Sequence, residues 1–371
     1  MPSKTEPLLR WGILSTAQIA RKNWKAIRNS GNATIVAVAS RDEERSRRFI
    51  ADCHHEAPLP VVPRALGSYE ALLASPEVEA VYIPLPTGLR KEWVLRAAAA
   101  GKHVLCEKPC AVTVADLEQM IDACQRNQVQ FMDGVMFMHS RRLQQIRQVL
   151  EDGTSVGDIR RISSAFSFCA DEAFFEGNIR SNSALEPHGC LGDLGWYTIR
   201  LALWVLKGRM PQRVTGRILA SAQGAHTAAA VPISFSGELL FEGGLSAGLY
   251  NSFITEHQQW AHVSGHKGYL QLTDFVAPFF GSEVGFEVNN VVHTVNGCDF
   301  NMEFHWRRFA TAEYANSHPT AQETNLFRTF SKLVLSGERD QSWPELSLKT
   351  QRILNACYSS ALADGAPVDQ I

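Results

Sequence analysis

The sequence lacks the features that mark membrane proteins and nucleic-acid-binding proteins. No run of about 18 apolar residues occurs, and the opening segment, Met-Pro-Ser-Lys-Thr-Glu-Pro, has no apolar core of a signal peptide. The formal net charge of the 371 residues is only −2, which leaves no basic field for nucleic acid or for an anionic membrane. We therefore expect a cytoplasmic protein whose partners are small molecules and other copies of the chain.

Cysteine is present without the spacing of a metal site or a redox motif. The eight cysteines are scattered and form no C-x-x-C pair. Cys106 and Cys110 have no neighbouring histidine–cysteine pair that would complete a zinc site. We expect reduced thiols, as in the cytosol, and no bound metal.

The glycine-rich dinucleotide fingerprint, G-x-G-x-x-G, is also missing. It should follow the first apolar run, residues 8–14, but the chain there reads Ser15-Thr16-Ala17-Gln18-Ile19-Ala20. Serine and alanine are the smallest residues that carry a Cβ, and a helix N-terminus attracts phosphate without glycine. Two interpretations stay open, an ordinary strand–helix turn and a degraded cofactor loop.

The first 140 residues do contain a regular alternation of strand-like and helix-like segments. This pattern predicts βαβ units around a parallel sheet, with a ligand crevice at the carboxyl ends of the strands. The expected strands are 8–14, 34–39, 78–85, 103–107 and 129–132. The expected helices are a segment that follows Ala20 and runs to about residue 29, and 42–52, 92–100 and 114–127.

After about residue 140 the pattern becomes that of a mostly antiparallel sheet. We expect strands at 158–168, 213–222, 228–241, 245–255, 259–274 and 283–296, and helices at 143–150, 189–206, 321–335 and 346–363. At this length two domains are expected. We place a dinucleotide-binding domain at 1–138 and an α+β domain at 139–371, whose last helix packs back on the first domain.

The end of the second strand bears on the choice of cofactor. An Asp or Glu there would accept hydrogen bonds from the ribose of NAD. The chain has Ser40-Arg41 instead, a small hydroxyl and a cation suited to a 2′-phosphate. A solvated surface arginine is the alternative. The residues favour NADP over NAD.

The strand at 103–107 ends in an acid, a base and a proline, Glu107-Lys108-Pro109. Pro109 biases Lys108 towards an extended backbone. A lysine held over a crevice can donate a hydrogen bond or a proton to a substrate oxygen. A solvated surface lysine is the alternative for Lys108 taken alone.

A second group of candidate residues lies in the glycine-punctuated segment at 189–197. Asp193 and Tyr197 are four residues apart and share one helical face. A tyrosine hydroxyl near a lysine has a lowered pKa, which makes proton transfer feasible. In the structural interpretation Asp193 caps the helix and Tyr197 packs against the sheet, and spacing alone does not decide between the two.

Taken together, these motifs are similar to the Gfo/Idh/MocA oxidoreductase family, whose type members include glucose–fructose oxidoreductase and inositol dehydrogenase. The resemblance covers nearly the whole chain, and the Ser-Thr-Ala loop is similar to the branch near dimeric dihydrodiol dehydrogenases. The most specific motif is the run that ends in Glu107-Lys108-Pro109. The segments that carry the resemblance are residues 11–21, 39–41, 82–89, 99–109, 131–134 and 192–197.

The resemblance implies an N-terminal Rossmann domain and a C-terminal α+β domain with a large open, mostly antiparallel sheet. It implies that Lys108 faces the substrate, that Glu107 orients the nicotinamide region and that Tyr197 stands at the acid–base position beside Asp193. It further implies a dimer or higher homo-oligomer through the open sheet, and often a cis peptide at Pro109. The residues that it assigns to the cofactor are Ser15, Thr16, Ala17, Gln18, Ile19, Ser40, Arg41, Pro84, Leu85, Pro86, Thr87, Glu107 and Lys108.

The chain departs from the family pattern at two positions. Arg90 stands where relatives often have a histidine, and the segment around His139 lacks their Arg and Pro. His139 lines the pocket or is structural, and the two roles are equally compatible with the sequence. These departures bear on the substrate more than on the chemistry.

The expected function is an NADP-dependent oxidoreductase that transfers a hydride between nicotinamide and a sugar, polyol or related hydroxy or carbonyl compound. A trans-dihydrodiol or dicarbonyl substrate is an alternative, because Phe166, Phe168, Phe174 and Phe175 could line an apolar pocket, although such phenylalanines are more often core. A second alternative is a non-catalytic dinucleotide sensor with the same fold.

Overall fold

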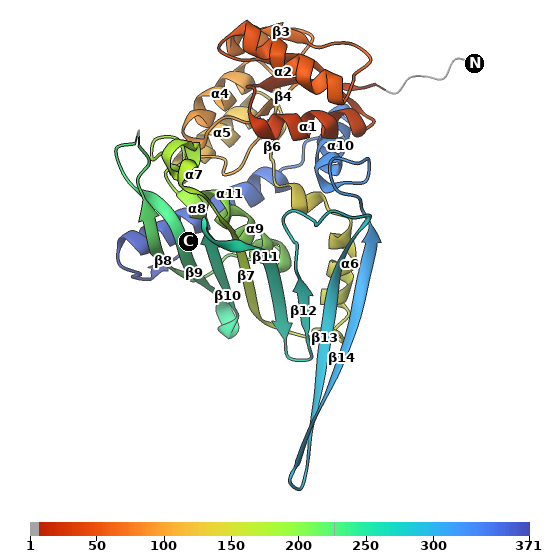
Figure 1. Cartoon of the computed structure of the whole chain (residues 1–371), viewed down its shortest axis with the longest axis vertical. Helices are drawn as coiled ribbons and strands as arrows, with labels where there is room; N and C mark the ends of the chain where they lie inside the picture. Colours follow the sequence, from red (N-terminus) through yellow and green to blue (C-terminus); the bar gives the residue numbers. More distant parts are fainter. Residues whose placement is uncertain (1–6, 226) are drawn as a thin grey trace, which may run out of the picture. The chain divides into compact units, whose positions relative to one another are not determined.

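A computed structural model describes residues 7–225 and 227–371. The chain divides into two compact units, one made of residues 1–140 and 314–351 and the other of residues 141–313 and 352–371 (Figure 1). The first break lies two residues after the boundary expected at 138. Residues 314–351, which were expected in the second domain, belong to the first unit. The long helix α11 (Ser342–Leu362) contributes residues to both units.

The first unit is built on a six-stranded sheet in the order β3-β2-β1-β4-β5-β6, with every pair parallel. This is the strand order of a Rossmann fold, and the order reverses between β1 and β4. The strands are β1 (Leu9–Leu14), β2 (Ala33–Ala39), β3 (Arg64–Leu66), β4 (Ala80–Ile83), β5 (His103–Cys106) and β6 (Phe131–Asp133). The helices are α1 (Gln18–Asn29), α2 (Glu43–Glu56), α3 (Tyr69–Leu73), α4 (Thr87–Ala99), α5 (Val114–Arg126), η1 (Met136–His139) and α10 (Gln322–Leu335).

The core of this unit explains why the strands are largely apolar. Trp11, on β1, is fully buried, and its ring packs against Phe327 and Phe330 of α10 at centroid distances of 5.3 and 5.0 Å. A parallel sheet is covered on both faces, so its strands read as continuous apolar runs. Sequence analysis missed β3 and α3, which are only three and five residues long.

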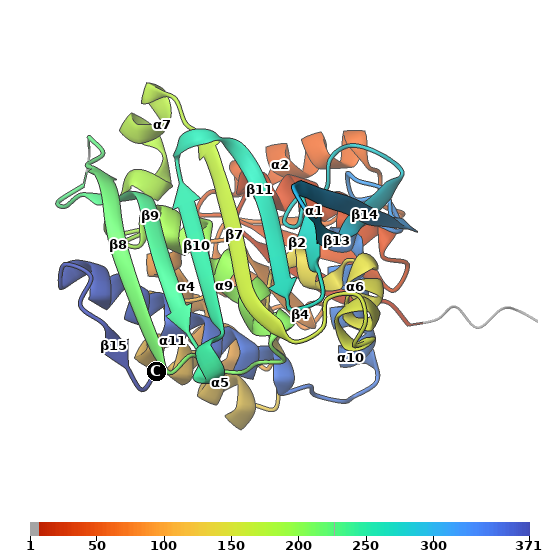
Figure 2. The same ribbon diagram turned by 90° about the horizontal axis from the view of Figure 1, so that it is seen from below.

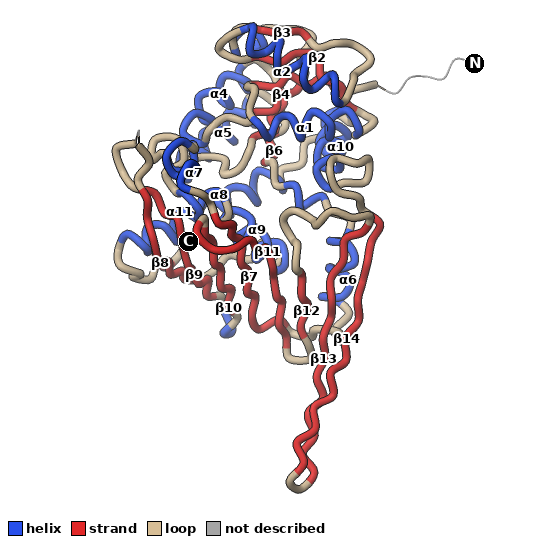
Figure 3. The backbone as a smooth tube through the Cα atoms, viewed as in Figure 1, coloured by secondary structure: helices blue, strands red, loops and turns tan. Residues whose placement is uncertain are grey.

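The second unit is built on a nine-stranded sheet in the order β14-β13-β12-β11-β7-β10-β9-β8-β15 (Figures 2 and 3). Among its described strands only the β7–β10 pair is parallel. The strands are β7 (Ile159–Cys169), β8 (Arg213–Ala222), β9 (Val231–Leu240), β10 (Ser246–Ser252), β11 (Ile254–Gly265), β12 (Tyr269–Leu272), β13 (Glu283–Asn296), β14 (Asp299–Ala312) and β15 (Val368–Asp369). The helices are α6 (Arg142–Glu151), α7 (Glu172–Gly177), η2 (Ile179–Ser181), α8 (Gly189–Asp193), α9 (Gly195–Val205) and η3 (Glu242–Gly244).

These two sheets confirm the expected fold class. The second unit differs from the sequence analysis in its details. Residues 259–274 hold two strands, 189–206 hold two helices that meet at Leu194, and α7, β14 and β15 were not expected. Gly189 opens α8 with φ +47°, and a Cβ there would lie 2.1 Å from the carbonyl oxygen of Pro232 on β9. The glycine is therefore needed for close packing of α8 on the sheet. Among the described residues no helix is both long and apolar enough to cross a membrane.

Candidate active site

The loop between β1 and α1 lies where the strand order of the first unit reverses. Ser15 has φ 125°, its N–H donates to Ala39 on β2 at 2.9 Å, and its hydroxyl donates to the carbonyl of Pro84 at 3.3 Å. Ser15 thus makes the tight turn that glycine usually makes. Ala17, the N-cap of α1, gives the helix no side-chain hydrogen bond, so first-turn amides are left for a phosphate. The loop fits a dinucleotide pyrophosphate.

The end of β2 forms a second turn in the same unit. The buried Ser40 hydroxyl donates to the carbonyl of Asp42 at 2.5 Å and accepts the Asp42 N–H at 3.2 Å. The Asp42 carboxylate in turn caps α2 by accepting the Glu44 N–H at 2.9 Å. Ser40 therefore shapes the turn that presents Arg41.

Two cations stand beside this turn. Arg41 and Arg45 are exposed, four residues apart, and neither forms an ion pair with any described residue. Burial raises the pKa of the Tyr69 hydroxyl, and the positive charges of Arg41 and Arg45 oppose that rise. The pair fits the 2′-phosphate of NADP. Sequence analysis missed Arg45 and Tyr69, because an arginine in a charged helix carries no distinguishing signal.

The loop after β4, with Pro84, Leu85, Pro86 and Thr87, is fastened by Arg90. Arg90 is only 5% exposed and donates to the carbonyl of Leu85 at 2.7 Å, to the hydroxyl of Thr87 at 3.0 Å and to the carbonyl of Pro109. It therefore ties the loop after β4 to the loop after β5. This gives the unusual Arg90 a structural role.

A buried chain of hydrogen bonds holds the carboxylate of Glu107. The Asn23 amide donates to the Tyr82 hydroxyl at 2.6 Å, and that hydroxyl donates to Glu107 Oε1 at 2.5 Å. Burial and then the charge of Glu107 raise the pKa of Tyr82 well above its ordinary value, so the phenol stays a donor. The Lys108 N–H donates to Glu107 Oε2 at 3.2 Å, and the Lys108–Pro109 peptide is cis. The half-buried Lys108 thus leaves β5 on a fixed backbone.

In the second unit, Asp193 and Tyr197 lie at the junction of α8 and α9. Asp193 Oδ2 accepts a hydrogen bond from Arg180 Nε at 2.7 Å, and both Asp193 and Tyr197 are almost buried. The N-cap of α9 is Leu194, so Asp193 does not cap that helix. The Tyr197 ring packs edge-on against Phe166 of β7 at 5.7 Å. The structural interpretation expected a helix cap from Asp193 and packing of Tyr197 against the sheet. The structure contains the second feature and lacks the first.

Arg180 is the member of this cluster that sequence analysis missed. The charge of Asp193 is the first cause of a raised pKa of Arg180, and Glu186 and Tyr197 add to it. Arg180 is therefore a cation fixed by its ion pair with Asp193. No motif marks it, because it lies in the irregular segment η2 and meets Asp193 only through the fold.

The other phenylalanines form a cluster of their own. Phe168 packs on the buried Phe253 at 5.0 Å and on Phe174 at 5.6 Å, and Phe175 packs on Phe174 at 5.5 Å. Phe166 stands apart beside Tyr197 and His257, at 5.7 and 6.4 Å. Of these four phenylalanines, only Phe166 therefore lies beside a candidate catalytic residue.

Lys108 belongs to the first unit, and Asp193 and Tyr197 to the second. His139 stacks on Trp343 at 4.8 Å, and its carbonyl accepts a hydrogen bond from Asn325. These contacts favour the structural role for His139.

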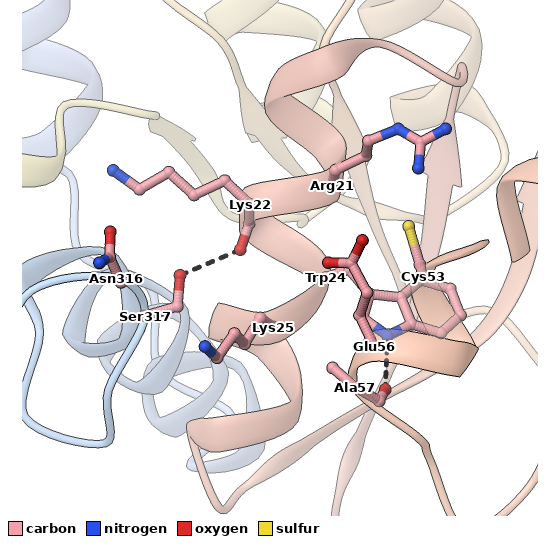
Figure 4. Close-up of a pocket in the computed structure, with 9 residues that line it drawn as sticks. All are labelled: Arg21, Lys22, Trp24, Lys25, Cys53, Glu56, Ala57, Asn316 and Ser317. Atoms are coloured by element: carbon pink, nitrogen blue, oxygen red, sulfur yellow. Dashed lines mark hydrogen bonds between the residues drawn. The ribbon is translucent and has the colours of Figure 1, made fainter.

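A surface hollow of about 220 Å³ is lined on one side by α1, through Arg21, Lys22, Trp24 and Lys25 (Figure 4). Two of its charged side chains form ion pairs, Arg21 with Asp52 at 2.9 Å and Lys22 with Glu323 at 3.5 Å. It contains none of the residues expected to act on a substrate. Within the described residues no group of His, Cys, Asp and Glu is placed to hold a metal ion.

The buried His188 predicts a loss of stability in acid. Its Nδ1 atom has no hydrogen-bond partner, and burial lowers the pKa of the ring to about 4. An unfolded histidine titrates near 6.5. Between pH 6.5 and pH 4 the unfolded state therefore binds a proton that the folded state does not, so the free energy of unfolding decreases as the pH is lowered. By pH 4 this costs about 3 kcal/mol.

Urea unfolding of the His188→Asn variant between pH 4 and 7 checks this prediction. The variant should lose less stability than the parent protein over this range. The matched control is His55→Asn, at an exposed position, which should leave the pH dependence unchanged. An equal loss in the parent and in His188→Asn would show that His188 is not the group responsible.

Comparison with known proteins agrees with the geometry of both units. Residues 9–135 match the model of an oxidoreductase family with an NAD-binding Rossmann fold, and residues 143–271 match the GFO/IDH/MocA C-terminal domain. D-xylose 1-dehydrogenase (NADP(+)) 2 of Haloferax volcanii is 28% identical over 97% of this chain and 99% of that protein. Trans-1,2-dihydrobenzene-1,2-diol dehydrogenase of Mus musculus is 30% identical over 73% of this chain and 76% of that protein.

A solved structure is similar over nearly the whole length. It is a 3-ketoreductase from Actinomadura kijaniata in complex with NADP and TDP-benzene. The TM-score is 0.77 at 25% identity, and the match covers 95% of this chain and 98% of that one.

Proposed function

The chain belongs to the GFO/IDH/MocA oxidoreductase family, and on that premise we propose the following reaction. The protein transfers a hydride between the nicotinamide of NADP and a carbinol or carbonyl carbon of a sugar, polyol or related hydroxy compound. The observation that carries the proposal is the fixed Glu107-Lys108-Pro109 loop at the carboxyl end of β5. This loop places the Lys108 side chain at the carboxyl ends of the strands, where open parallel sheets bind their ligands.

The first unit has groups that fit each part of NADP. The loop from Ser15 to Ile19 would hold the pyrophosphate at the N-terminus of α1. Arg41, with Arg45 beside it, would hold the 2′-phosphate, and Ser40 supports their turn. The loop Pro84-Leu85-Pro86-Thr87 and the carboxylate of Glu107 would border the nicotinamide.

Bound NADP supplies or accepts the hydride, and the protein's own side chains handle the charge and the proton. Lys108 donates a hydrogen bond to the substrate oxygen, which favours the negative charge that develops there. Tyr197 carries the proton to or from that oxygen. Asp193, fixed by Arg180 at 2.7 Å, holds the start of α9 and with it Tyr197.

A second candidate substrate class is the trans-dihydrodiols. It is favoured by the position of Phe166, whose ring lies edge-on to Tyr197 at 5.7 Å. An aromatic ring there would contact a flat apolar substrate next to the proton carrier. The relation to the dihydrodiol dehydrogenase of Mus musculus supports this class as well.

We also propose a cytoplasmic location and a homodimer or higher homo-oligomer. The proposed contact is the open face of the nine-stranded sheet. That face carries half-buried rings, among them Trp260, His262 and Tyr269, in contact with one another at 5.1 and 6.1 Å. Half-buried aromatic rings in a row are typical of a surface that another protein covers.

The experiment that tests the reaction is NADPH oxidation against aldoses, ketoses and dicarbonyls, with NADP reduction by trans-dihydrodiols as a parallel arm. We expect turnover with at least one compound and a preference for NADPH over NADH. Turnover confined to dihydrodiols would favour the second candidate. Cofactor binding without turnover on any compound would contradict both and favour a dinucleotide sensor.

A further inference from the structure

A chain of three buried side chains leads from helix α1 to the end of β5. Asn23 lies on α1, Tyr82 on β4 and Glu107 directly after β5, and all three are buried. Asn23 Nδ2 and Glu107 Oε1 lie 2.6 and 2.5 Å from the hydroxyl oxygen of Tyr82. The chain thus joins the helix whose N-terminus fits a pyrophosphate to the loop that carries Lys108. Neither Asn23 nor Tyr82 takes part in the proposed reaction itself.

The direction of the two hydrogen bonds follows from the protons that the chain contains. The phenol has one proton to donate, and the Glu107 carboxylate only accepts. If the amide of Asn23 were turned so that its oxygen faced Tyr82, two acceptors would compete for this one proton. The amide nitrogen therefore faces the phenol, and the phenol donates to Glu107.

This orientation leaves the carbonyl oxygen of Asn23 unsatisfied. Among the described residues Asn23 Oδ1 is buried and has no hydrogen-bond partner. A buried acceptor without a partner destabilises the folded state, and such groups are uncommon in folded proteins. An apolar side chain of similar size on α1 would avoid this loss of stability. The amide is therefore better explained by its hydrogen bond to Tyr82 than by its own contribution to stability.

The carboxylate of Glu107 is also confined from the side of β6. Gly134 directly follows β6, and a Cβ there would lie 3.1 Å from Glu107 Oε1 and 3.3 Å from Oε2. These distances are shorter than ordinary van der Waals contact, so glycine leaves the carboxylate its position. While Tyr82 holds Oε1, Oε2 accepts the N–H of Lys108 at 3.2 Å. The carboxylate thus has contacts that fix both of its oxygens.

We propose that Tyr82 is a positioning residue of the hydride transfer and that Asn23 keeps its hydroxyl turned towards Glu107. The phenol holds Glu107 Oε1, so Oε2 stays opposite the N–H of Lys108 and sets where the lysine side chain leaves the loop. A displacement of a catalytic group by about 1 Å can lower a rate about 10²-fold, so this support has a measurable effect. The inference rests on the proposed function, because Tyr82 acts only through Lys108.

The test is a double-variant cycle of Tyr82→Phe and Lys108→Ala, with kcat and KM measured in each variant. Tyr82→Phe should lower kcat by about 10-fold or more and leave the KM for NADPH within about 3-fold. In the Lys108→Ala background the same substitution should lower kcat by less than about 3-fold. An equal loss in both backgrounds, or an unimpaired Tyr82→Phe variant, would overturn the inference alone. Unimpaired turnover in Lys108→Ala would contradict the proposed function and the inference together.

Ser331→Ala is the matched control for the loss of a buried hydrogen bond. The Ser331 hydroxyl, on α10 in the same unit, accepts the Nε1–H of the buried Trp11 at 3.2 Å. This variant and Tyr82→Phe should lower the midpoint of urea unfolding to a similar extent. Only Tyr82→Phe should lower kcat, and Ser331→Ala should keep it within about 2-fold. An equal loss of kcat in both variants would reduce Tyr82 to a structural residue.

Asn23→Leu separates positioning from stability. It removes the donor to Tyr82 together with the unsatisfied oxygen, so the urea midpoint should stay or rise while kcat falls by about 3-fold or more. A lower midpoint with an unchanged kcat would show that the chain only stabilises the fold.

Crystal structures of the unsubstituted protein and of Tyr82→Phe give a readout that does not depend on turnover. In Tyr82→Phe the Glu107 carboxylate should turn, and the hydrogen bond from the Lys108 N–H to Oε2 should be lost. A carboxylate that keeps its place and its hydrogen bond to Lys108 in the variant would overturn the inference, whatever the activity.

Discussion

Replacing Lys108 by alanine is expected to lower turnover by about 10²-fold or more while leaving NADPH binding close to that of the unsubstituted protein. The ammonium group is lost from the end of β5, so the substrate oxygen loses the donor that stabilises its developing charge. The backbone of the loop should persist, because Tyr82 and Arg90 hold the neighbouring Glu107 and Pro109. Steady-state rates and NADPH titration by fluorescence measure the two quantities separately.

Lys91→Ala is the matched control for this prediction. Lys91 lies on α4, outside the loop, and pairs with Asp116 at 2.6 Å. The substitution removes the same charge and should change turnover by less than about 3-fold, since the ion pair of Lys91 contributes only to stability and only weakly. Unimpaired turnover in Lys108→Ala would remove Lys108 from the catalytic role.

The double variant Arg41→Ala and Arg45→Ala is expected to raise the KM for NADPH by about 100-fold and to leave the KM for NADH nearly unchanged. A hydrogen bond to a charged group contributes about 1.5–3 kcal/mol, so the loss of two guanidinium groups is large. NADH lacks the 2′-phosphate and should not respond. Kinetics with both cofactors in each variant give the comparison.

The same helix supplies the control for the cofactor prediction. Arg47 and Arg48, also on α2, form ion pairs with Glu43 and Glu44 and are therefore engaged elsewhere. Arg47→Ala with Arg48→Ala removes two charges and should leave the NADPH preference within about 3-fold of the original. A rise in KM that is equal for NADPH and NADH in the Arg41 and Arg45 variant would place the 2′-phosphate elsewhere.

The fold could be predicted where side chains repeat with one clear period. Strands β1, β2 and β5 are apolar on both faces, and that pattern predicts a parallel sheet. Strand β14 was missed although it carries a strand signal, since Phe300, Met302, Phe304 and Trp306 alternate with polar residues along it. The break between α8 and α9 was missed because it falls at Leu194, an apolar residue with no glycine or proline signal of its own.

The candidate site could be predicted only in part. Glu107 and Lys108 stand out because charges at the end of an apolar strand are unusual. Arg180 and Arg45 carry no such signal, since an arginine in a loop or on a surface helix is ordinary until the fold supplies its neighbours. For Arg90 the sequence indicated only a departure from the family pattern, and the structure shows that it fastens two loops together.

We propose that a hydride passes directly between the cofactor and a substrate carbon beside Lys108. The sharpest test is the reaction of NADPH that carries deuterium at both C4 positions of the nicotinamide with the carbonyl compound that gives turnover, followed by NMR of the product. We expect one deuterium on the new carbinol carbon for each NADPH oxidised, and a rate about 10²-fold lower in Lys108→Ala. NADPH oxidation without deuterium in the product would contradict it.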